Sequence, residues 1–114
     1  MAEWIDIEDE QQFEQEVQSH PQIVAIFGDS SNHMWRMSLG AIQGMADSVP
    51  PFIAFLHVDK PRTPQLFQKR NVTVVPTVRF IHEGKQVHEI KGNEVNPEGI
   101  SKGMQKLQQA EQNV

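Results

Sequence analysis

The sequence predicts a three-layer α/β domain in which a mixed sheet of about five strands lies between about four helices. Short apolar runs alternate with helical patterns along most of the chain, and this alternation is typical of parallel strands joined by helices. A hairpin signal near the C-terminal end adds antiparallel strands. No internal repeat or linker interrupts the 114 residues, so we predict a single domain over residues 1–114.

The predicted strands are short segments rich in β-branched and aromatic side chains. Residues 23–27 read Ile-Val-Ala-Ile-Phe, which is the continuous apolar pattern of a strand buried on both faces. The pair Glu83-Gly84 separates two further strands and favours a tight hairpin turn. The five predicted strands are residues 4–7, 23–27, 52–58, 77–82 and 85–90.

A polar capping residue stands at the start of each predicted helix, where a side-chain oxygen can accept a hydrogen bond from a free backbone N–H. In the third and fourth helices a proline follows the cap, a position that suits it. Gly40 and Gly44 weaken the second helix by about 1 kcal/mol each against alanine, and we expect a bend or a close contact there. The caps and helices are Asp9 with a helix to residue 19, Asn32 with 34–47, Thr63 with 64–70, and Asn96 with a helix from 97.

Composition excludes several classes of function. The chain has no cysteine, so it can form no disulfide, thiolate nucleophile or cysteine-type zinc site. Ten basic and fifteen acidic residues give a net charge of −5, which does not favour nucleic acid or an anionic membrane surface. No segment is apolar enough to span a bilayer and the start is acidic, so we expect a cytoplasmic protein.

The histidines do not indicate a metal site. No two of the five have the i, i+4 spacing of helical ligands. His82 and His88 fall on paired strands, but we interpret them as structural or solvated side chains. We therefore predict no metal and no cofactor.

The order β-α-β-α-β-α-β-β-α, with Val75-Pro76-Thr77 directly before the hairpin, resembles that of the thioredoxin family. Pro76 follows Asn32 by 76 − 32 = 44 residues, which is similar to the family's spacing between its redox motif and its cis-proline. Gly84 and Gly92 also stand where the family has glycines. The resemblance covers nearly the whole chain and implies a thioredoxin fold with a cis bond between Val75 and Pro76, facing residues 32–35.

The departures from the family pattern concern its chemistry. The resemblance places the family's two redox cysteines at Asn32 and Trp35, and thiol–disulfide exchange requires both thiols. It places the family's buried acid and lysine at Ile26 and Phe55, and both replacements are apolar. Loss of the thiols and loss of the proton relay agree with each other, so we predict no catalytic residue and no enzymatic oxidoreductase activity.

What remains is binding, and the resemblance points to the groove beside the cis-proline. There Val75 would offer backbone groups to an extended segment of a protein partner, and Trp35 is either a groove anchor or a core residue. The expected groove consists of Asn32, His33, Met34, Trp35, Val75, Pro76, Thr77 and Gly92. The expected protein is an adaptor or assembly module, as a monomer or weak dimer. A glutathione-like small molecule in the same groove and purely structural self-association are the alternatives.

Overall fold

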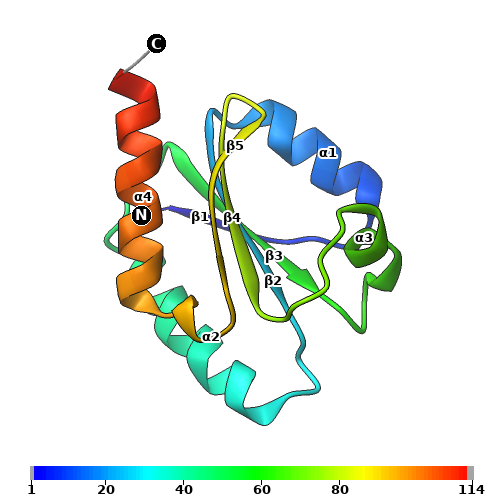
Figure 1. Ribbon diagram of the computed structural model, residues 1–114. Coiled ribbons are helices and arrows are strands. Elements are labelled where there is room, and N and C mark those ends of the chain that lie inside the picture. The colour runs from blue at the N-terminus through cyan, green and yellow to red at the C-terminus, as the bar shows by residue number, and fades with distance from the viewer. Residues whose placement is uncertain (1, 113–114) are drawn as a thin grey trace.

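The computed structural model describes residues 2–112 and contains a five-stranded mixed sheet flanked by four α-helices (Figure 1). The strands lie in the order β1-β3-β2-β4-β5; β1, β3 and β2 are parallel, while β4 and β5 are antiparallel to their neighbours. The predicted thioredoxin fold is thereby confirmed. The elements are β1 (Glu3–Asp6), α1 (Glu10–Ser19), β2 (Gln22–Gly28), α2 (His33–Ala46), β3 (Ile53–Asp59), α3 (Pro64–Lys69), β4 (Thr77–His82), β5 (Lys85–Lys91), the 3₁₀ turn η1 (Gly92–Glu94) and α4 (Pro97–Gln112).

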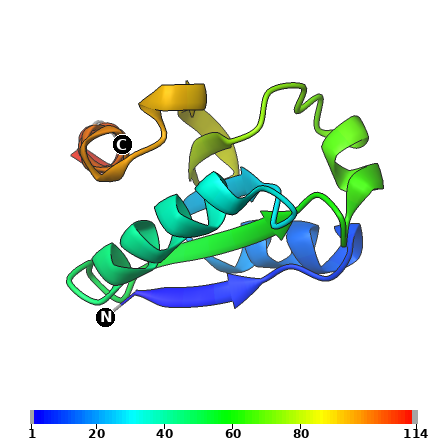
Figure 2. The ribbon, with the colours of Figure 1, turned by 90° about the horizontal axis from the view of Figure 1, so that it is seen from below.

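The central strand β2 organises two apolar cores because its side chains alternate between the faces of the sheet. Val24 and Ile26 face α2 and α4. They pack in the first core with Ile42 of α2, Phe80 of β4 and Ile100 of α4. The opposite face of β2 packs with side chains from α1 and α3 in the second core, and Figure 2 shows helices on both sides of the sheet. All seven residues of β2 are buried, as the unbroken apolar run predicts.

Three of the four predicted caps form the expected side-chain hydrogen bond. The side-chain oxygens of Asp9, Asn32 and Asn96 accept hydrogen bonds from backbone N–H groups of their helices at 2.8–3.0 Å. Thr63 also stands at its predicted N-cap position, with Pro64 directly after it, but its side chain makes no capping hydrogen bond. Its hydroxyl instead donates to the carbonyl of Asp59 at 3.0 Å and thus closes the turn after β3.

The hairpin turn has the backbone that its sequence predicts. Glu83 and Gly84 both have positive φ, +50° and +79°, which matches the twist of the flanking strands. In α2, by contrast, a Cβ added at Gly40 or Gly44 would meet nothing within 4 Å, so the close contact expected there is absent. No helix within residues 2–112 is long and apolar enough to cross a membrane.

Candidate functional site: a groove beside Val75 and Pro76

The turn from β2 into α2 is held by side-chain oxygens. Asp59 accepts the N–H of Ser30 at 2.8 Å, and Asp29 accepts the N–H and hydroxyl of Ser31 at 2.9 and 2.6 Å. The two bonds from Ser31 hold the pKa of Asp29 below its usual value, because they favour the charged carboxylate. Asn32 then caps α2 through the N–H of Trp35 at 3.0 Å. The segment where the family carries its redox motif is therefore an ordered turn without a thiol.

Trp35 belongs to the core of the protein. It is only 4% exposed and packs with the residues beneath α2. Its indole covers Gly28, where an added Cβ would lie 2.1 Å from Nε1 and 2.2 Å from Cε2. The absence of a side chain at Gly28 is thus what makes room for the indole. The sequence left Trp35 open between anchor and core, and its burial places it in the core, although it also contributes to the lining of the groove.

The two positions that correspond to the family's proton relay have no contact with solvent. Ile26 and Phe55 are fully buried in the first core. An acid or a lysine at either place would lose its hydration, at a cost of several kcal/mol per ion. Below the groove there is accordingly no titratable side chain at these positions to carry a proton.

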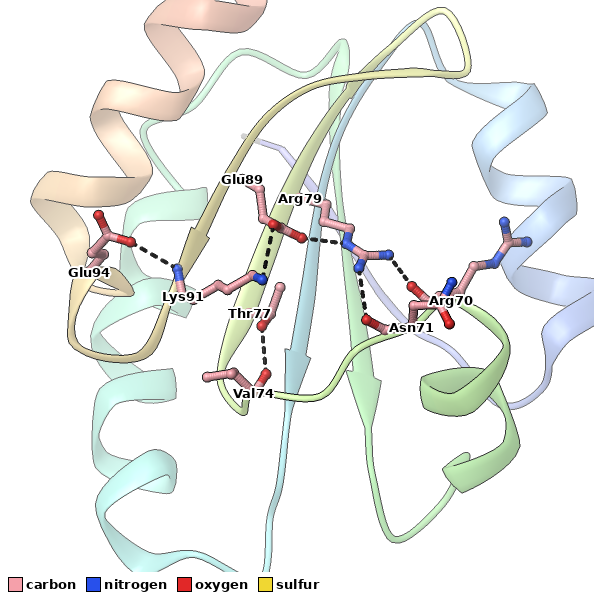
Figure 3. Close-up of polar contacts among 8 residues, drawn as sticks. All are labelled: Arg70, Asn71, Val74, Thr77, Arg79, Glu89, Lys91 and Glu94. Atoms are coloured by element: carbon pink, nitrogen blue, oxygen red, sulfur yellow. Dashed lines mark hydrogen bonds and ion pairs between the residues drawn. The ribbon is translucent and has the colours of Figure 1, made fainter.

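The loop on the other side of the groove, residues 70–76, leads into β4 and contains the cis Val75–Pro76 peptide bond that the sequence predicts. Figure 3 shows how polar contacts hold the two ends of this loop. Arg79 donates to the carbonyl oxygens of Arg70 at 2.6 Å and Asn71 at 3.5 Å, and the Thr77 hydroxyl donates to that of Val74 at 2.5 Å.

Arg79 is itself oriented by Glu89 on β5, whose carboxylate accepts from Nε at 2.8 Å and also pairs with Lys91 at 3.5 Å (Figure 3). Partial burial pushes the pKa of Glu89 upward, but the hydrogen bond and charge of Arg79, with help from Lys91, outweigh it. The pKa of Glu89 is therefore lowered. The carboxylate thus remains charged and holds the arginine against the loop.

Between the α2 start, this loop and η1 lies a groove of about 420 Å³. Six of the residues expected from the sequence line it: Asn32, Met34, Trp35, Val75, Pro76 and Gly92. His33 does not, because its exposed ring turns toward Arg36, 3.4 Å away. Thr77 does not either, because it is buried against Val74. The groove also contains residues that the sequence reasoning missed: Asp29, Ser38, Asn93, Val95 and Asn96.

The groove has features suited to binding a polypeptide. In the part of the chain that the structure describes, the N–H and C=O of Val75 have no hydrogen-bond partner. Two large apolar side chains are exposed at this place: Met34, which lines the groove, is 73% exposed, and Val74, which precedes Val75, is 42% exposed. Asp29 is the sole charged residue among those that line the groove.

Comparison with known proteins agrees with this geometry. The model of the Thioredoxin family matches residues 5–106, and the chain therefore belongs to the thioredoxin family. Mitochondrial thioredoxin 3 from Saccharomyces cerevisiae is similar at 19% identity and a TM-score of 0.79, over 90% of this chain and 94% of that one. Thioredoxin from Fasciola hepatica is similar at 22% identity and a TM-score of 0.77, over 90% and 97%. No curated protein sequence matches the chain.

Family membership and the absence of cysteine together define the chemistry. A thioredoxin-family chain without cysteine has neither the attacking nor the resolving thiol that disulfide exchange requires. The protein is therefore a redox-inactive member of its family.

Proposed function

We propose that this protein is a binding module that holds an extended segment of a protein partner in the groove beside Val75 and Pro76. The observation that carries the proposal is the free N–H and C=O of Val75 next to exposed Met34 and Val74. An extended chain can pair with such backbone groups as an added strand, while apolar pockets select its side chains. Methionine suits this role because its flexible thioether adapts to different partners.

Peptide binding is favoured over a glutathione-like ligand by the charge of the groove. No lysine, arginine or histidine is among the residues that line it. The nearest candidate, Arg36, donates from Nη1 to the carbonyl of Ser30 at 2.7 Å and lies beside His33. A small anion would therefore meet Asp29 and neutral amides, whereas a peptide backbone can use the same amides as hydrogen-bond partners.

The proposal is tested by selecting linear peptides of random sequence on the full chain and measuring the affinity of the selected peptides. Ser38 lines the groove and is exposed, so Ser38→Trp should block it and weaken binding at least about tenfold, the range of a hot-spot loss. Gln43→Trp is the matched control, since Gln43 is exposed on the same helix away from the groove.

Amide chemical shifts locate the bound peptide independently of the variants. We expect the largest changes at residues 32–35, 74–76 and 92–96. Selected peptides that bind equally well to both tryptophan variants, or that shift only residues elsewhere, would contradict the proposal. Failure to select any groove-binding peptide from a large library would contradict it as well.

A further inference from the structure

We propose that His82, Glu83 and Glu111 form a binding site for a divalent transition-metal ion such as Zn²⁺. The site lies at the end of β4, near the last turn of α4. One nitrogen or oxygen atom from each of the three side chains lies within 4.8 Å of the others. Imidazole nitrogen with carboxylate oxygen is a donor set that Zn²⁺ and its first-row neighbours accept. Three protein ligands leave a position for water.

His82 forms the floor of this site. It follows Val78 and Phe80 on the face of β4 that packs against α4, and it is only 7% exposed. Its Nε2 points at the Glu111 carboxylate, 2.7 Å away. A buried imidazole fixed in orientation by its surroundings is a preorganised ligand, because little side-chain entropy is lost when the ion binds.

Glu83 is the residue that distinguishes a metal site from a simple contact between β4 and α4. A tether between β4 and α4 needs only His82 and Glu111. Glu83 adds a second carboxylate, held in place by the hairpin backbone at φ +50° and by its N–H, which donates to the carbonyl of Pro21 at 2.8 Å. Two carboxylates side by side repel each other unless a positive charge lies between them.

Among the described residues no lysine or arginine supplies that charge, and the basic partner of Glu111 is the proposed ligand His82 itself, 2.7 Å away. Within residues 2–112, neither Glu83 nor Glu111 forms an ion pair with a lysine or an arginine. Ligands about 2.0–2.2 Å from a tetrahedral ion stand roughly 3.3–3.6 Å apart, so the Glu111 carboxylate, 2.7 Å from His82, must withdraw by about 0.6–0.9 Å to admit the ion. Glu111 is 58% exposed in its side chain and lies near the end of α4, where such a movement is easy.

The test is calorimetric titration of the untagged full chain with Zn²⁺ alone. We expect one ion per chain, and Glu83→Gln and Glu111→Gln should each weaken binding at least about tenfold, the scale on which metal-site partners act. Both glutamates are exposed, so the folds should survive. His88→Gln and Glu98→Gln are the matched controls, because neither residue belongs to the cluster, and they should leave affinity unchanged.

Paramagnetic Co²⁺ provides a second readout, and it should broaden the amide signals of residues 82–84 and 108–111 selectively. A structural tether predicts a different pattern: Glu83→Gln has no effect, and His82→Gln lowers the melting temperature equally with and without Zn²⁺. That pattern would overturn the proposal. So would the absence of saturable binding below about 1 mM, or binding that persists in the double variant Glu83→Gln, Glu111→Gln.

Discussion

Gly28→Ala is the substitution that tests most directly how Trp35 is accommodated. The new Cβ would lie 2.1, 2.2 and 2.4 Å from three atoms of the indole, far inside contact distance, and the ring is buried. Overpacking of this kind lowers the free energy of unfolding by about 1–3 kcal/mol. Alanine also reduces the conformational entropy of the unfolded chain, which raises the free energy of unfolding by about 0.4–1 kcal/mol. We expect a net loss of about 1.3 kcal/mol, or about 5 °C in melting temperature for a domain of this size.

The same substitution in a Trp35→Leu background isolates the cause. Leucine lacks all three of the clashing indole atoms, so Gly28→Ala should there be neutral or stabilising, which gives a coupling energy of about 2 kcal/mol. Urea denaturation followed by circular dichroism measures all four corners of the cycle. Gly40→Ala is the control, since a Cβ there meets nothing within 4 Å and should stabilise the helix by up to about 1 kcal/mol. Equal costs of Gly28→Ala in both backgrounds would refute the reasoning.

Three further outcomes follow from the same contacts. Arg79→Gln should cost about 2 kcal/mol at pH 7. Because the pKa of Glu89 is lowered from its ordinary value of 4.5, the stability that this shift contributes is complete above that value and is lost as the pH falls through the folded pKa. The difference from wild type should therefore shrink as the pH falls below 4.5, as denaturation at several pH values would show. Asn32→Ala should lose about 1 kcal/mol by removing the cap of α2, whereas Asn32→Asp should retain it in the same assay. Asn32→Cys with Trp35→Cys should give at most weak insulin reduction with dithiothreitol, since the relay positions are apolar, and thioredoxin-like turnover would contradict this.

The elements that the sequence predicts well are those whose signal is local. The apolar run of β2 and the turn pair Glu83-Gly84 predict their structures because burial on both faces and positive φ each restrict the residues that fit. Thr63 occupies its predicted N-cap position but makes no capping bond, because serine, threonine and asparagine side chains have several backbone partners within reach. In that turn the carbonyl of Asp59 was the available one.

The candidate site was harder to predict because its walls come from distant segments. The spacing from Asn32 to Pro76 identified two walls through the family resemblance. The resemblance also named Gly92, where the third wall begins, but it missed Asn93 and Val95 because a short 3₁₀ turn has no periodic pattern. His82 and Glu111 are 29 residues apart and meet only after α4 packs on the sheet, so histidine spacing alone could not reveal the cluster.

The contacts that shape the loop before β4 have a consequence for how this surface can change. Arg79 contacts the loop through the carbonyl oxygens of Arg70 and Asn71, and Thr77 through that of Val74, groups that every amino acid carries. The side chain displayed at Val74 is therefore uncoupled from the frame that presents it. Substitution there changes the chemistry of the exposed surface without changing the shape of the loop. In the proposed binding role, a lineage of such proteins could therefore acquire new partners one exposed residue at a time while the scaffold stays intact.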